Sequence, residues 1–120
     1  MITGMASERM AVLQGTLDLM VLRTLEAMGP LHAYAIASRL QQASSDALKL
    51  NQGTLYPALV RLEQQGHIAG AWGRSESNHE ARFYSLTRAG ARRLAEETRR
   101  WRQLAGMMER LLGSVAGEEA

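Results

Sequence analysis

The sequence of 120 residues contains no cysteine. The chain therefore forms no disulfide, no thiolate metal site and no cysteine nucleophile. It also lacks an uncharged stretch that approaches the roughly 18 apolar residues needed to span a membrane. Its first ten residues, MITGMASERM, show neither the basic flank nor the apolar core of a secretory signal. We therefore expect a cytoplasmic protein.

Sequence signatures of catalysis are missing as well. The three histidines, His32, His67 and His79, are far apart, and none has a neighbour at metal-ligand spacing. No Gly-x-Ser-x-Gly elbow occurs, and the glycine of GPLHAYAI follows an expected helix rather than the strand that precedes a phosphate-binding loop. We expect neither an enzyme nor a metal or cofactor site.

The composition is that of a single folded domain, with 46% hydrophobic and 22% charged residues. At 13.2 kDa, a compact fold would expose about 6,400 Å² of surface. Of the 14 basic residues, Lys49 is the only lysine, and arginine favours bidentate contacts to phosphate and guanine. A GC-rich genome would also encode arginine in place of lysine, so the charge permits nucleic-acid binding without establishing it.

Hydrophobic periodicity predicts three helices, a β-hairpin and a fourth helix. Thr16 and Asp18 are expected to begin the first helix, Gly66 to cap the third and Thr87 to begin the fourth. The expected helices cover residues 11–28, 32–42, 51–65 and 88–112, and the hairpin strands cover residues 68–73 and 81–86.

This order of elements is the layout of a winged helix-turn-helix. The predicted fold class is mainly α with a small β-hairpin, a winged helix-turn-helix plus a C-terminal dimerisation helix. We assign residues 1–87 to a DNA-binding domain, in which residues 1–10 are flexible. Residues 88–112 form the dimerisation helix, and residues 113–120 form a flexible acidic tail.

The third helix has two chemically different faces. Three leucines at helical spacing are expected to face the core. The opposite face carries small, hydroxyl, amide and guanidinium groups, which suit contacts with base edges and phosphates in a major groove. An ordinary solvent-exposed helix face can have the same composition. The inner residues are Leu55, Leu59 and Leu62, and the outer ones are Gly53, Thr54, Pro57, Arg61 and Gln64.

The hairpin loop carries cations that could contact phosphates, namely Arg74 and Arg82 at its two ends. Glu76 and Glu80 lower the net charge there, and a polar, solvent-exposed loop is the alternative interpretation.

The fourth helix carries an apolar stripe that is longer than a small core can cover. Such a stripe predicts a homodimer, because an exposed apolar face would favour aggregation. Trp101 offers a flat surface for an aromatic effector, with Met108 as an adaptable wall, although Trp101 packing against its partner helix is the alternative. The expected interface residues are Leu94, Trp101, Leu104, Met108 and Leu111.

Three motifs in order, GPLHAY, GTLYPALVRLEQQG and FYSLTRAG, resemble the PadR family of bacterial transcriptional regulators. The resemblance covers roughly residues 13–112 and is to the short subclass with one C-terminal helix. It departs at Ala33, where many relatives have glycine after the histidine. The resemblance implies a repressor that binds an inverted-repeat operator as a homodimer. It also implies a small-molecule effector in some members, without identifying one.

The resemblance further implies which residues contact DNA. The GTLYPAL helix would be the recognition helix in the major groove, and the hairpin would be the wing on the flanking backbone. The alternative is a winged-helix protein-interaction adaptor without specific DNA binding, which the net charge of only +2 permits. The implied contacts are Asn51, Gln52, Thr54, Tyr56 and Arg61 in the helix, and Arg74, His79 and Arg82 in the wing.

Overall fold

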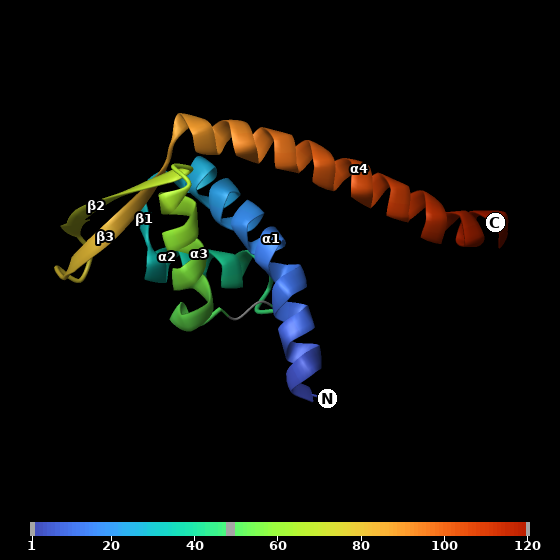
Figure 1. Cartoon of the computed structure of the whole chain (residues 1–120), viewed down its shortest axis with the longest axis horizontal. Coiled ribbons are helices and arrows are strands. Elements are labelled where there is room, and N and C mark those ends of the chain that lie inside the picture. The colour runs from blue at the N-terminus through green and yellow to red at the C-terminus, as the bar shows by residue number, and fades with distance from the viewer. Residues whose placement is uncertain (1, 48–49, 120) are drawn as a thin grey trace.

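The computed structural model describes residues 2–47 and 50–119. The expected fold class, a mainly helical winged helix-turn-helix followed by a long C-terminal helix, is confirmed (Figure 1). In this part of the chain the elements are α1 (Ile2–Met28), β1 (Leu31–His32), α2 (Ala33–Ala43), α3 (Gln52–Gln64), β2 (Ile68–Arg74), β3 (Glu80–Leu86) and α4 (Arg88–Glu119).

The ends of α3 and α4 are set by local hydrogen bonds. Asn51 is the N-cap of α3, and its side-chain oxygen accepts the amide N–H of Thr54 at 2.9 Å. Gly66 follows the last turn of α3 with φ +79°, a left-handed conformation that glycine adopts without strain. At the start of α4, the Thr87 hydroxyl accepts the amide N–H of Gly90 at 3.0 Å. The expected caps at Gly66 and Thr87 are therefore confirmed.

Two helices are longer than expected. Helix α1 begins at Ile2, so the start expected at Thr16 and Asp18 is wrong. Asp18 lies in the middle of α1 with its side chain only 6% exposed, and its carboxylate pairs with arginines instead of capping a helix. Helix α4 continues beyond Leu112, its expected end, to Glu119. The expected flexibility of residues 1–10 and 113–120 stays a prediction.

The hairpin is present as predicted, but it belongs to a larger sheet. The two hairpin strands pair antiparallel from Ile68 opposite Leu86 to Arg74 opposite Glu80. Strand β1 adds to the other edge of β3 and gives the order β1-β3-β2. It has only two residues, which is too short for a hydrophobic pattern to indicate.

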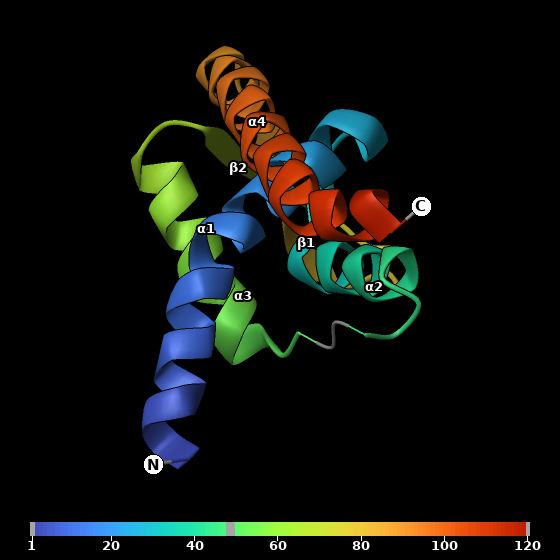
Figure 2. The same cartoon turned by 90° about the vertical axis from the view of Figure 1, so that its right-hand side faces the viewer.

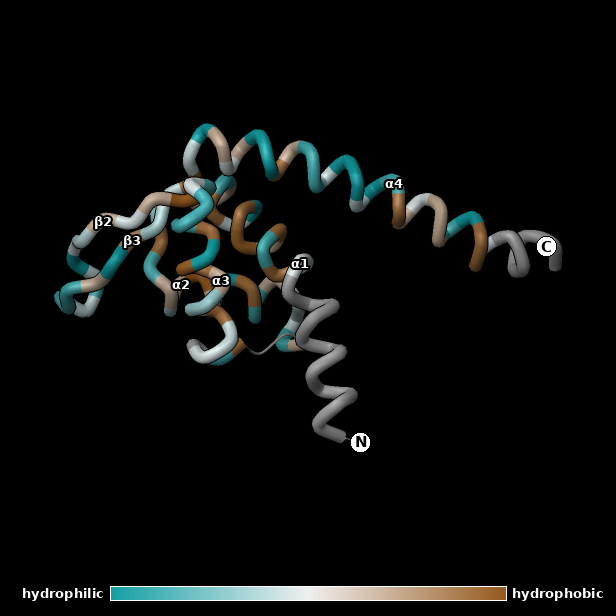
Figure 3. The backbone as a smooth tube through the Cα atoms, in the orientation of Figure 1, coloured by the Kyte–Doolittle hydropathy of each residue, from teal (hydrophilic) through white to brown (hydrophobic). Residues whose placement is uncertain are grey.

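The hydrophobic core lies where α1, α2 and α3 meet beside the sheet (Figure 3). The three leucines of α3 expected to face inward are completely buried there. The buried residues of this cluster are Leu17, Val21, Leu22, Leu25, Ile36, Leu40, Leu55, Ala58, Leu59, Leu62, Ile68, Tyr84 and Leu94.

Helix α4 packs on α1 at its beginning and then leaves the body of the molecule (Figures 1 and 2). The molecule is elongated as a result, with dimensions of 58 × 36 × 25 Å. Its accessible surface is 8486 Å², well above the roughly 6,400 Å² of a compact chain of this mass. The second half of α4 contributes to this excess with large apolar side chains that are exposed.

Candidate nucleic-acid interface

Helix α3 is divided into a buried face and a free face. Its outer face presents Tyr56, Pro57 and Val60 to solvent, while Thr54 is half-buried. Exposed Asn51 lies just before the first turn and uses its side-chain oxygen as the cap, so its NH₂ group is left for a ligand. The surface at the start of α3 therefore combines a polar cap residue with apolar and aromatic side chains, and it lies at the positive end of the helix dipole. The side chain of Gln52 lies outside the described residues.

Tyr56 connects this surface to the sheet. Its side chain is half exposed, and it neighbours Tyr84 of β3, which is buried. Burial, and then the neighbouring Tyr56, raise the pKa of Tyr84 above its ordinary value. Tyr56 therefore lies between the surface of α3 and the sheet, with half of its side chain accessible.

Arg61 does not point outward as the helical wheel predicted. Its Nη2 atom lies 2.6 Å from Oδ1 of Asp18 on α1, and its side chain is only partly exposed. The expectation of an outward Arg61 is wrong because a buried carboxylate on the neighbouring helix holds the guanidinium, and no periodicity within α3 reveals that carboxylate.

The wing presents one exposed arginine and one exposed histidine, Arg74 and His79, as expected. Its loop is closed by the Ser75 N–H, which donates to the His79 carbonyl at 2.9 Å. Arg74 donates to the backbone carbonyl of Asn78 at 3.2 Å and so lies along the loop. These two side chains form the accessible tip of the hairpin.

Arg82 is turned back towards α3 rather than outward. It forms an ion pair with Glu63 of α3 and lies over the ring of Trp72 at 5.9 Å. The hydrogen bond that Arg82 donates to the Glu63 carboxylate is the largest cause of the raised pKa of Arg82. Arg82 therefore joins the wing to α3, and its expected contact with DNA stays a prediction.

Trp72 was not among the expected contacts, although it is 67% exposed on β2. The stack with Arg82 covers part of its ring and fixes it on the surface of the wing. The sequence did carry a signal for this exposed ring: a tryptophan within a predicted hairpin of small residues has neighbours too small to cover it.

The expected seam on α4 divides between two environments. Leu94 is only 3% exposed and belongs to the core of its own chain, so its assignment to an interface between chains is wrong. Trp101 is 51% exposed, and further along α4 the side chains of Leu104 and Met108 are also largely exposed. Among the side chains of α4 that the structure describes, the large exposed apolar ones are Trp101, Leu104, Met107, Met108, Leu111 and Leu112, and we call them the distal stripe.

A groove of about 660 Å³ lies between α1 and α4, upstream of most of the distal stripe. Neither Trp101 nor Met108 lines it, so an effector pocket at those residues stays a prediction. Its lining residues are Arg23, Glu26, Leu94, Ala95, Thr98, Arg99, Arg102 and Gln103.

The described part of the chain holds no cluster of three or more His, Asp or Glu side chains able to bind a metal ion. Among the same residues, no helix combines the length and apolarity that crossing a membrane requires.

The three-helix core, the antiparallel wing and the free outer face of α3 together define a winged helix-turn-helix protein. Residues 21–96 match the model of the transcriptional regulator PadR-like family. The chain belongs to this family, as its motifs indicated, and the family is one of transcription regulators rather than enzymes.

Solved structures agree with this assignment. A PadR family transcriptional regulator from Eggerthella lenta is 30% identical, covers 92% of this chain and 95% of its own, and has a TM-score of 0.72. A PadR-like transcription factor from Bacteroides fragilis is 26% identical, with coverage of 88% and 98% and a TM-score of 0.72. A transcriptional regulator from Clostridium thermocellum shares the fold at 23% identity, with coverage of 83% and 93% and a TM-score of 0.74.

Proposed function

We propose that this PadR-family chain represses transcription by binding an inverted-repeat operator in the bacterial cytoplasm as a homodimer. The observation that carries the proposal is the division of α3 into a buried face and a free face. Leu55, Leu59 and Leu62 anchor the helix, while the outer face of its N-terminal half stays exposed. A helix held in this way can enter a major groove without rearrangement of the core.

The proposed DNA contacts follow from what each exposed group can donate or accept. Asn51, Thr54 and Tyr56 are nearest to the helix start and are assigned to base edges and neighbouring phosphates. Arg74 and His79 at the wing tip are assigned to the flanking backbone. Gln52 remains in the set on the strength of the family motif. Arg61 and Arg82 pair with carboxylates of the same chain, and their contacts with DNA stay predictions.

The homodimer is supported by the distal stripe. These large apolar side chains, at helical spacing on a projecting helix, form the kind of surface that a second copy of the same helix covers. Two copies related by a twofold axis would present two recognition helices, which matches an inverted repeat.

Selection of duplexes from a random-sequence pool tests the proposal. We expect an inverted repeat to be enriched, and its affinity to fall steeply with salt because phosphate contacts release counterions. The adaptor alternative predicts weak retention of DNA and no enriched sequence. Thr54→Ala is expected to relax preference at one or two base pairs, each worth roughly 1–3 kcal/mol.

A small aromatic effector at the dimer seam is the second part of the proposal. Trp101 and Met108 are both exposed on the distal stripe, so a dimer would bring such side chains from two chains together. In a Trp72→Phe background, binding of planar aromatic compounds is expected to quench Trp101 fluorescence and weaken operator binding in parallel. Quenching without a change in DNA affinity, or no quenching across a broad panel, would leave Trp101 as a packing residue.

A further inference from the structure

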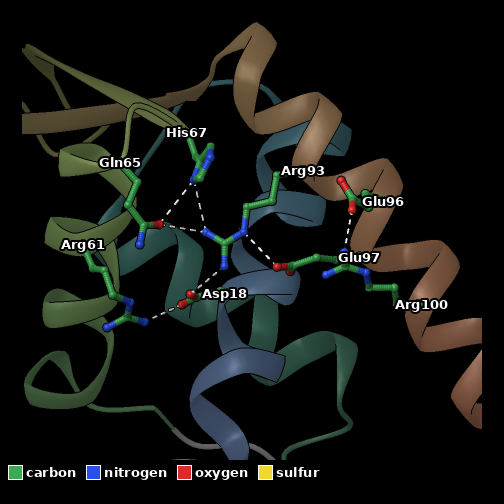
Figure 4. Close-up of polar contacts among 8 residues, drawn as sticks. All are labelled: Asp18, Arg61, Gln65, His67, Arg93, Glu96, Glu97 and Arg100. Carbon is green, nitrogen blue, oxygen red and sulfur yellow. Dashed lines mark hydrogen bonds and ion pairs between the residues drawn. The ribbon is translucent and has the colours of Figure 1, made fainter.

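One buried carboxylate connects the recognition helix to the dimerisation helix. Asp18 lies in the middle of α1 with its side chain 6% exposed. Its Oδ1 atom accepts from Nη2 of Arg61 on α3 at 2.6 Å, and its Oδ2 atom accepts from Nη2 of Arg93 on α4 at 3.2 Å (Figure 4). Asp18 therefore holds one arginine from each of the two helices that the proposed function requires to be aligned.

Arg93 extends this connection to the C-terminal end of α3. Its Nη1 atom lies 2.9 Å from Oε1 of Gln65 and 3.1 Å from Nδ1 of His67, and its Nε atom donates to Glu97 at 2.9 Å (Figure 4). Burial lowers the pKa of Arg93, but Glu97 and Asp18 outweigh it and raise the pKa overall. The Arg93 guanidinium therefore stays charged. Its N–H groups point to α1, to the end of α3 and the turn after it, and to α4 itself.

The same two helices are also joined through their backbones. The Thr87 N–H donates to the His67 carbonyl at 3.2 Å, and the Thr87 hydroxyl donates to the Gly66 carbonyl at 2.6 Å. A Cβ at Gly90 would lie 2.0 Å from the same His67 oxygen, so the first turn of α4 fits closely against the turn after α3. The backbone contacts join the end of α3 to the start of α4, and the Asp18 carboxylate adds a side-chain connection in the last turn of α3.

This arrangement differs from the exposed ion pairs that lie within single described helices. Arg100 with Glu96 and Arg23 with Glu26 are exposed pairs within a single helix. Such pairs contribute little and connect no elements. Loss of the Asp18 charge, by contrast, would leave two arginines facing each other without the carboxylate between them.

We propose that Asp18 is a positioning residue that sets the direction of α3 relative to α4, and with it the half-site spacing that the dimer selects. The proposal rests on the proposed dimeric DNA-binding function. In a dimer formed through α4, a change in the angle between α3 and α4 alters the separation of the two recognition helices. That separation must match half-sites about 34–36 Å apart, one turn of DNA.

A spin-label measurement tests the geometry without DNA. Because the chain has no cysteine, Gln64→Cys places one label on an exposed position of each α3, and the dimer then gives one distance between the two recognition helices. We expect a single narrow distance in the otherwise unchanged chain. Asp18→Asn, which keeps the size of the side chain, is expected to broaden or shift the distance between the two labels. Glu96→Gln, the matched control, removes a pair within α4 and should leave it unchanged.

A second measurement uses the duplex selected by the unchanged chain, with the spacer between half-sites at its original length or changed by one base pair. Asp18→Asn is expected to bind the original duplex about tenfold more weakly and to lose most of its preference among the three spacers, a coupling in the range common for linked sites. A purely structural role would weaken binding to all three duplexes equally. Where Asp18→Asn fails to fold, Arg93→Gln leaves the Asp18–Arg61 pair in place and should give the same broadening.

The outcomes separate this inference from the function on which it rests. A narrow distance and an unchanged spacer preference in a folded Asp18→Asn dimer would overturn the positioning role alone. A chain that gives no distance between labels, or that selects no duplex, would contradict the proposed dimeric DNA binding and overturn the positioning role with it. If Glu96→Gln broadens the distance between the labels as much as Asp18→Asn does, the positioning role is also overturned, since the loss of any ion pair would then produce the effect.

Discussion

The two halves of α4 have the same apolar spacing but different surroundings. Leu94, in the first half, is 3% exposed and packs with α1 in the core of its own chain. Trp101, seven residues later on the same face, is 51% exposed, and the side chains of the distal stripe beyond it are exposed as well. The difference arises because α1 runs beside only the first part of α4 (Figure 1).

This comparison shows that a helical repeat identifies a buried face without identifying the partner that buries it. The first half of α4 stabilises the fold and connects to α3 through Arg93. The second half is the surface that we propose a second copy of the chain covers. On that proposal one continuous stripe supports both folding and association, and changes on either side of the boundary near Trp101 should separate the two roles.

The largest expected effect comes from charges on the distal stripe. Leu104→Glu combined with Met108→Glu should convert the dimer to a monomer, because carboxylates at the seam would be buried without partners. We expect the dimer dissociation constant to rise by at least about 100-fold, measured by analytical ultracentrifugation across a dilution series. The circular dichroism spectrum of the winged helix should stay unchanged. A double variant that remains dimeric would place the interface elsewhere.

Leu94→Ala should act on folding instead. Removing a buried leucine side chain is expected to lower the free energy of unfolding of the chain by about 2–5 kcal/mol. Chemical denaturation at a fixed protein concentration measures this loss. Leu104→Ala, the matched change in the distal stripe, should affect association rather than the stability of the separated chain. If Leu94→Ala and Leu104→Ala lower the free energy of unfolding of the separated chain equally, the two halves of α4 do not differ as we infer.

A smaller effect should distinguish the internal arginine from the one at the wing tip. Arg61→Ala removes one of the two partners of buried Asp18 and is expected to cost about 1–3 kcal/mol of stability, without lowering the salt dependence of DNA binding. Arg74→Ala should leave stability unchanged and reduce the salt slope by about one ion. Thermal unfolding and binding at several salt concentrations measure both quantities. If Arg61→Ala lowers the salt dependence of DNA binding, Arg61 contacts a phosphate.

Much of the fold could be predicted from local sequence. The leucine spacing of the third helix, its end at Gly66 and the cap at Thr87 depend on neighbours in sequence, and all are observed. The hairpin also followed from local pattern, whereas the two residues of β1 are defined only by their pairing with β3.

The side-chain arrangement of the site was less predictable. Arg61 and Arg82 look like DNA contacts when each element is considered alone, but carboxylates from other elements, Asp18 and Glu63, hold them. Asp18 and Arg61 are 43 positions apart in sequence. Such a contact leaves no periodic signal, and the same reasoning explains why Leu94 was assigned to the wrong interface.

The most direct test of the account compares the full inverted repeat with the same duplex in which one half-site is scrambled. Sedimentation of the complex and a binding titration together give stoichiometry and affinity. We expect two chains on the full repeat and a loss of about 10²–10⁴ in affinity when one half-site is scrambled, since the second recognition helix then gains nothing from being tethered. One chain per duplex, or equal affinity for the two duplexes, would contradict it.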